Sequence, residues 1–160
     1  MSDIIDFMKA KNFSLKDQDD NIKTLADFKG SWLVLYFYPK DDTPGCTVEA
    51  CSLRDSNDKL ITAGAQVVGS SKDDADSHRK FKAKHQLNFT LLSDPEGTTI
   101  QTYGAWGKKM FGREGILRKT FIIDPRGNIQ KTYGRVTSMG HGEQILRDLK
   151  QLQSRVPNEA

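Results

Sequence analysis

The most restrictive feature of this 160-residue chain is a continuous apolar run, Leu33 to Tyr38. Such a run has the length of one strand and offers no polar face to solvent. Strands of this kind lie near the centre of sheets that are covered on both faces. A helix is expected over residues 44–61, because Pro44 suits a first helical turn and Gly64 can end the element. This strand with a helix directly after it predicts an α/β fold.

Strands and helices alternate along the rest of the chain. We expect an N-terminal hairpin from residues 13–15 and 22–25, strands at 66–70 and 88–92, a turn at 94–97, and a second hairpin from 120–124 and 129–133. Ser71 to Asp74 resembles a capping box that opens a helix to about His85. The last helix begins near His141, with an apolar stripe formed by Ile145, Leu149, Leu152 and Val156. The pattern predicts a central mixed β-sheet flanked by helices, with an N-terminal β-hairpin, in one domain over residues 1–160.

Composition excludes several classes of function. Hydrophobic residues make up 36% and charged residues 28% of the chain, which is typical of a globular protein. A net charge of +3 with scattered Lys and Arg argues against nucleic-acid binding. The first residues do not read as a signal or transit peptide, and no apolar run reaches transmembrane length, so we expect no membrane partner. We expect a cytoplasmic protein, whose thiols are kept reduced.

The two cysteines, Cys46 and Cys51, are the candidates for chemistry. Cys46 follows Thr43-Pro44-Gly45 at the start of the expected helix. A thiol there meets unpaired backbone N–H groups and the positive end of the helix dipole, and both favour thiolate over thiol. Cys46 is therefore expected to be the reactive sulfur.

The spacing of the two cysteines predicts a conformational change. Five helical steps place their Cα atoms ~8.6 Å apart, whereas a disulfide needs less than ~7 Å. The first turn must therefore unwind before the sulfurs bond. This suits oxidation of Cys46 to a sulfenic acid, followed by condensation with Cys51. A general thiol–disulfide oxidoreductase is the alternative, which the absence of Cys-x2-Cys disfavours. A thiol-based metal or binding protein is disfavoured because no histidine has zinc-site spacing to the cysteines.

At these residues the chain resembles a peroxiredoxin. The run Pro39-x3-Thr43-x2-Cys46 is similar to the peroxidatic signature of that superfamily, and its extension to Cys51 resembles the Q-type group, the bacterioferritin comigratory proteins. The similarity covers nearly the whole chain. It implies a thioredoxin-like fold and a thiol-dependent peroxidase acting on hydrogen peroxide and organic hydroperoxides.

The resemblance also implies a role for each residue of the motif. Cys46 would be the peroxidatic nucleophile and Cys51 the resolving thiol. Thr43 would form a hydrogen bond with the peroxide. Pro39 would shield the sulfur of Cys46 from water, and Arg118 would be the charged group over that sulfur. Thioredoxin or glutaredoxin would reduce the resulting disulfide. No metal or other cofactor is implied, and a monomer is expected, with a dimer left open.

Simpler interpretations stand beside these roles. Cys51 could pack on the helix face, Thr43 could be a turn or cap residue, and Pro39 could merely end the strand. Arg118 could be a strand-edge charge, since only the family pattern favours it over other arginines. Glu49 is expected to be an exposed acid of the first helical turn.

Other polar and aromatic residues carry weaker expectations. Asp41 and Asp42 would oppose thiolate formation slightly if they lay near Cys46. The three histidines are expected at the surface or at caps: His78, His85 and His141. Tyr103 is expected in the core. Three further apolar residues could belong to the core or could form the rim of an apolar entrance for organic hydroperoxides: Trp106, Met110 and Phe111.

Overall fold

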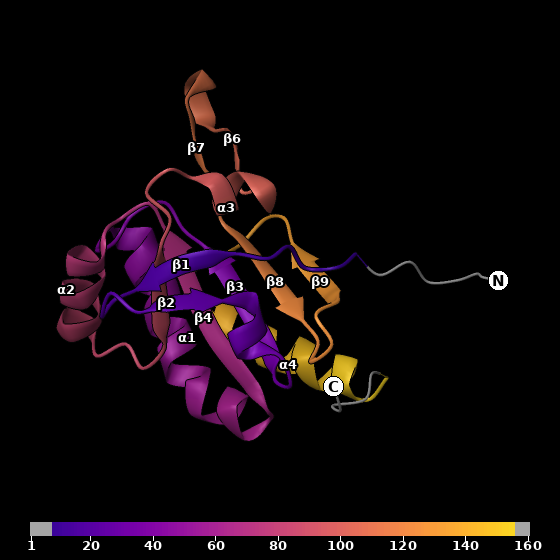
Figure 1. The fold of residues 1–160 in the computed structure, drawn as a ribbon. Helices are drawn as coiled ribbons and strands as arrows, with labels where there is room; N and C mark the ends of the chain where they lie inside the picture. Colours follow the sequence, from indigo (N-terminus) through magenta and orange to yellow (C-terminus); the bar gives the residue numbers. More distant parts are fainter. Residues whose placement is uncertain (1–7, 156–160) are drawn as a thin grey trace.

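The structure, a computed structural model, describes residues 8–155 except the side chain of Met110. Its strands are β1 (Ser14–Asp17), β2 (Ile22–Thr24), β3 (Trp32–Phe37), β4 (Ala65–Ser71), β5 (Thr90–Ser93), β6 (Trp106–Lys108), β7 (Glu114–Ile116), β8 (Lys119–Ile123) and β9 (Ile129–Tyr133). Its helices are α1 (Pro44–Thr62), α2 (Ala75–His85), α3 (Thr98–Thr102) and α4 (His141–Gln153), with 3-10 turns η1 (Leu25–Phe28) and η2 (Met110–Gly112). Figure 1 shows these elements around one twisted sheet.

The main sheet is mixed and seven-stranded, in the order β2-β1-β5-β4-β3-β8-β9. The apolar run predicted as a central strand is β3, which lies between the parallel strand β4 and the antiparallel strand β8. All of its residues are buried. The N-terminal hairpin is present as the antiparallel pair β1 and β2, and the second hairpin as β8 and β9. These predictions are confirmed.

Two apolar clusters occupy the two faces of the sheet. Alternate residues of β3 face opposite sides, so Val34 and Tyr36 belong to one cluster and Leu35 and Phe37 to the other. The first cluster includes buried residues of α1, α2 and α4, and the second includes buried residues of η1 and α3. Covered faces of this kind explain why the central strand is apolar throughout.

The start of α2 differs from the prediction. Ser71 is the last residue of β4, where it pairs with Ser93 of β5, so it does not open a capping box. Asp74 is the N-cap residue, and its carboxylate accepts a hydrogen bond from the N–H of Ser77 at 2.8 Å. The capping prediction was wrong because Ser71 still belongs to the sheet, so the helix begins only after Asp74.

The segment before β8 contains elements that were not predicted. Helix α3 is short, and β6 and β7 form a separate two-stranded hairpin that extends from the body of the molecule (Figure 1). Phe111 lies in η2 between them and is 94% exposed. Strands of three residues are too short to show a periodic pattern in the sequence.

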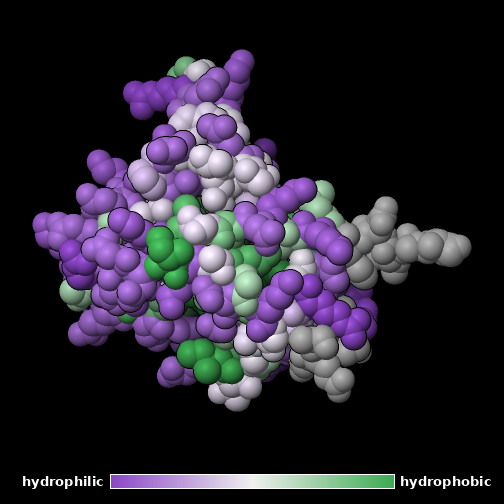
Figure 2. All heavy atoms as spheres, in the orientation of Figure 1, coloured by the Kyte–Doolittle hydropathy of each residue, from purple (hydrophilic) through white to green (hydrophobic). Residues whose placement is uncertain are grey.

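The last helix follows its predicted stripe. Ile145, Leu149 and Leu152 are buried on α4, whereas Val156 lies outside the described residues. Figure 2 shows a mainly hydrophilic surface on the face viewed in Figure 1, with apolar residues scattered over it. Within residues 8–155, no helix combines the length and apolar character that crossing a membrane requires.

Candidate active site

Cys46 lies in the first turn of α1, which follows β3 after a loop of residues 38–43. Thr43 is the N-cap residue and Pro44 the first helical residue, as the sequence predicts. The backbone N–H of Thr47 already bonds to the carbonyl of Thr43 at 2.8 Å. The N–H groups of Gly45 and Cys46 precede the first intrahelical bond, so they remain available to an anion. Cys46 itself is 1% exposed and packs in the first apolar cluster.

The guanidinium of Arg118 lies over this helix start. A Cβ atom placed on Gly45 would come within 2.6 Å of Arg118 Nη2, so the glycine leaves the space that the guanidinium occupies. Burial acts to lower the pKa of Arg118, but Cys46 and Glu49 outweigh burial and hold this pKa above its ordinary value. The structure therefore brings Arg118 to Cys46, at the end of the loop that joins β7 to β8.

Glu49 is the partner of Arg118, and its predicted position was wrong. Its side chain is fully buried, and Glu49 Oε1 accepts a hydrogen bond from Arg118 Nη1 at 3.0 Å. Glu49 Oε2 has no hydrogen-bond partner among the described residues. Burial raises the pKa of Glu49 to about 7, although Arg118 acts in the opposite direction. The pKa of this carboxyl group therefore lies near neutral pH, one helical turn after Cys46.

Thr43 and Pro39 flank the same loop. The hydroxyl of Thr43 donates to the carbonyl of Lys40 at 2.9 Å and makes no capping bond. The hydroxyl proton of Thr43 is therefore already donated, but the hydroxyl oxygen can still accept a hydrogen bond from a ligand. Pro39 follows the end of β3 and is half-buried, which suits both strand ending and shielding.

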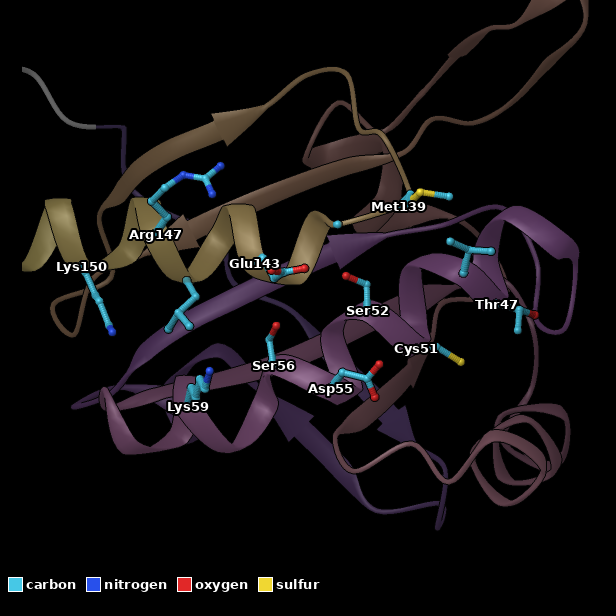
Figure 3. A pocket seen from close by; sticks show the side chains of 13 residues that line it. Thr47, Cys51, Ser52, Asp55, Ser56, Lys59, Met139, Glu143, Arg147 and Lys150 are labelled. Atoms are coloured by element: carbon cyan, nitrogen blue, oxygen red, sulfur yellow. The ribbon is translucent and has the colours of Figure 1, made fainter.

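Cys51 lies on the same intact helix, one and a half turns after Cys46. Both cysteines are free thiols, as the spacing argument predicts for a continuous α1. Cys51 is half-buried and lines a groove between α1 and α4 (Figure 3). It is more accessible than Cys46.

Asp41 anchors the loop that leads into α1. It is 8% exposed, and its carboxylate contacts the hydroxyl of Tyr38 at 2.6 Å and Nδ1 of His78 at 2.7 Å. Its backbone N–H donates to Asp73 at 2.8 Å. Asp42 instead pairs with Lys84 and His85.

Asp41, Asp73 and His78 place potential metal-ligand atoms within 4.8 Å of one another. Each of the three already makes hydrogen bonds, and Nε2 of His78 also contacts the carbonyl of Leu92 at 2.9 Å. The cluster is therefore explained as a buried network that fixes the loop before α1 against α2 and β5.

The other weak expectations have mixed outcomes. His78 and His141 were expected at the surface or at caps, and both are fully buried; His141 is the first residue of α4 and contacts the hydroxyl of Thr120 at 2.8 Å. Tyr103 is buried in the core as predicted. Trp106 is half-buried against the second cluster, and Lys72 Nζ lies 4.9 Å from its ring centroid.

Comparison with known proteins identifies the class. Residues 8–132 match the model of the AhpC/TSA family. Peroxiredoxin Bcp of Bacillus subtilis is 43% identical over 147 residues, covering 90% of this chain and 94% of the relative. Peroxiredoxin Bcp of Escherichia coli K12 is 43% identical over 145 residues, covering 89% and 93%.

Solved structures agree with the sequence relatives. A cysteine-to-serine mutant of PrxQ from Xylella fastidiosa superposes with a TM-score of 0.87 at 32% identity, covering 94% of this chain and 99% of that one. The bacterioferritin comigratory protein of Xanthomonas campestris gives 0.83 at 34% identity, covering 88% and 91%. The chain therefore belongs to the AhpC/TSA family and, within it, to the Q-type peroxiredoxins, also named Bcp. It has their thioredoxin-like fold and is a thiol peroxidase.

Proposed function

We propose that Cys46 is the peroxidatic cysteine of this peroxidase. Its thiolate attacks one peroxide oxygen, the S–O bond forms as the O–O bond breaks, and the departing oxygen takes a proton to leave as alcohol or water. Cys46 becomes a sulfenic acid. The observation that carries this proposal is the placement of Cys46 at the N-terminus of α1 beneath the guanidinium of Arg118.

The residues around Cys46 support each part of this step. Arg118 and the free N–H groups of the first turn stabilise the thiolate and the negative charge that develops on the departing oxygen. Thr43, whose own proton is held by Lys40, accepts a hydrogen bond from the peroxide O–H. Pro39 limits the access of water to the sulfur. Glu49 holds the guanidinium in place through its 3.0 Å hydrogen bond.

Cys51 then resolves the oxidised site. Its thiol attacks the sulfenic sulfur, the disulfide forms, and water is released. Because both residues belong to a continuous helix, the first turns of α1 must unwind before the sulfurs can meet. A disulfide also protects Cys46 from irreversible oxidation.

The finer features of the function follow from this chemistry. The Xanthomonas campestris relative was studied for alkyl peroxide reduction, which supports organic hydroperoxides beside hydrogen peroxide as substrates here. A dithiol protein of the thioredoxin or glutaredoxin class would recycle the disulfide. We further propose a monomeric enzyme of the cytoplasm, formed as one domain.

Two cysteine variants test the proposal. Cys46→Ser is expected to abolish peroxide consumption, because serine is not oxidised by peroxide. Cys51→Ser is expected to keep one rapid oxidation, trapped as a sulfenic acid at position 46 by a sulfenic-acid reagent and mass spectrometry, but to lose thioredoxin-supported turnover. Peroxide turnover in the Cys46 variant, or normal thioredoxin-supported turnover in the Cys51 variant, would remove the residue concerned from the mechanism.

A further inference from the structure

The groove beside Cys51 runs between two helices and continues well beyond the thiol. It has a volume of about 870 Å³ and lies between α1 and α4. In Figure 3, Cys51 and Met139 lie toward one end, Asp55 and Glu143 in the middle, and Lys59 and Lys150 at the other end. Lys59 lies eight helical steps after Cys51, a distance of ~12 Å along α1. The groove is thus much longer than contact with a peroxide requires.

The end near the thiol is apolar and exposed. Val48 of α1 is 43% exposed, and Met139, in the loop before α4, is 79% exposed. Both line the groove with Cys51. Exposed apolar side chains beside a redox-active thiol provide a contact surface that excludes water when a partner binds.

The far end carries positively charged side chains that form no ion pair with any residue the structure describes. They are Lys59, Arg147 and Lys150, which line the groove. Asp55 forms its ion pair with Arg54, at 2.9 Å, rather than with Lys59 or Lys150. Glu143 lies in the middle of the groove and forms no ion pair with any residue that the structure describes. The charge of the far end complements an acidic partner.

The junction between the helices holds this surface in place. The N–H of Gly142 donates to Ser52 Oγ at 2.8 Å, and a Cβ on Gly142 would overlap the backbone oxygen of Ser52. This close contact begins one residue after Cys51. Unwinding of the first turns of α1 can therefore stop at Ser52, while Lys59 and Lys150 keep their positions.

We propose that this α1/α4 groove is the docking surface for the protein reductant that recycles the disulfide. The partner is a dithiol protein with apolar surface around its reactive thiol and carboxylates ~12 Å from it, matching the spacing from Cys51 to Lys59. This inference rests on the proposed function, because it requires the Cys46–Cys51 disulfide. Beyond the proposed function, the inference states where the reductant binds and which charge the surface of the reductant carries.

The recycling step follows from the position of Cys51. A thiolate of the reductant attacks the Cys51 sulfur, which lines the groove, and the Cys46 sulfur leaves as a thiolate. The helix start and Arg118 favour that leaving group. The second thiol of the reductant then attacks the mixed disulfide, so that the reductant becomes oxidised and Cys51 is released as a thiol.

Charge reversal at the far end tests the docking surface. The double variant Lys59→Glu/Lys150→Glu is compared with Lys16→Glu/Lys29→Glu, a matched pair of lysines outside the groove. For each protein, kcat/KM for bacterial thioredoxin, kept reduced by thioredoxin reductase and NADPH, is divided by the rate constant for recycling by dithiothreitol. We expect this ratio to fall at least tenfold in the groove variant and to stay at the wild-type value in the control. Added salt should lower the ratio in the wild type and the control, which keep the groove lysines, but not in the groove variant.

Each other outcome overturns the docking proposal. An unchanged ratio in the groove variant, or an equal fall in the control, would show that the groove does not select the protein reductant. A fall seen only when glutathione replaces thioredoxin would assign the cations to a small anionic thiol. Stopped-flow oxidation of the reduced wild type by peroxide is measured in parallel. Failure of that oxidation would reject the proposed function, whereas normal oxidation with an unchanged ratio rejects the groove alone.

Discussion

At the scale of single residues, Gly45 controls the position of Arg118. A Cβ at residue 45 would overlap the guanidinium at 2.6 Å, so Gly45→Ala is expected to push the side chain away from Cys46. Loss of a charged group aimed at a developing anion lowers the rate, and partial displacement should slow peroxide oxidation about tenfold or more. Alanine favours a helix over glycine, but moving Arg118 also disturbs its 3.0 Å hydrogen bond to the buried Glu49, so any gain in stability should be smaller than about 1 kcal/mol.

Stopped-flow oxidation and denaturant unfolding together check this prediction. Gly134→Ala is the matched control, because a Cβ there meets no atom within 4 Å. A Gly45→Ala protein that reacts as fast as the wild type would show that the position of Arg118 over the helix start does not matter for the reaction.

Glu49 makes stability depend on pH in an unusual direction. Its native pKa is about 7 against an ordinary 4.5, so the folded protein holds a proton that the unfolded chain releases. The contribution of Glu49 to the free energy of unfolding is therefore fully present below about pH 4.5. It is lost as the pH rises to about 7, and the loss is on the order of 3 kcal/mol. Glu49→Gln should flatten that part of the profile.

The measurement is the free energy of unfolding of the wild type, Glu49→Gln and Glu143→Gln between pH 5 and 8. The exposed Glu143 on α4 controls for removal of a carboxylate. Parallel profiles for the wild type and the Glu49 variant would contradict the buried, proton-binding state of this residue.

The buried position of Glu49 could have been inferred from the sequence. Cys46, Ala50 and Leu53 are spaced as one helix face, and Glu49 is three residues after Cys46, on that same face. An acid on the buried face of a helix indicates a partner cation. The identity of that cation could not be predicted from physical reasoning alone, because Arg118 is 69 residues away along the chain.

At the scale of elements, the contact between α1 and α4 depends on a glycine. Residue 142 has no room for a side chain, because a Cβ placed there would overlap the backbone of Ser52. Gly142→Ala is therefore expected to destabilise the protein by about 1–3 kcal/mol, since a backbone contact relaxes less readily than a side-chain contact.

Thermal and denaturant unfolding measure this effect, with Gly134→Ala again as the control. If Gly142→Ala were as stable as the wild type, α4 could move away from α1 without any loss of folding free energy. That result would also remove the support for a groove of fixed shape.

Elements were predictable where their pattern was long. Pro44 indicated the start of α1, and the run of apolar residues indicated β3. Both elements agree with the structure. The β6–β7 hairpin was missed because its strands have three residues each and pair only with each other. The error at Ser71 arose because a local capping pattern competed with sheet pairing to β5, which lies far along the chain.

At the scale of the whole molecule, the fold class followed from the alternation of strands and helices, whereas the polar networks did not. His78 joins Asp41, before α1, to the carbonyl of Leu92 in β5. His141 at the start of α4 contacts Thr120 in β8. Such contacts depend on which segments the finished sheet brings together, so a single sequence does not reveal them. They fix the body of the fold around the helix start that the proposed disulfide requires to unwind.

The central claim is that oxidation unwinds the first turns of α1 while the rest of the helix stays folded. Hydrogen exchange of the reduced protein and of the peroxide-oxidised, disulfide-bonded protein tests it most directly. Amides of residues 47–51 should exchange slowly when reduced and rapidly when oxidised, while amides of residues 53–62 stay protected in both states. A Cys46–Cys51 disulfide, verified by mass spectrometry, in a protein whose amides 47–51 keep their reduced-state protection would contradict the account.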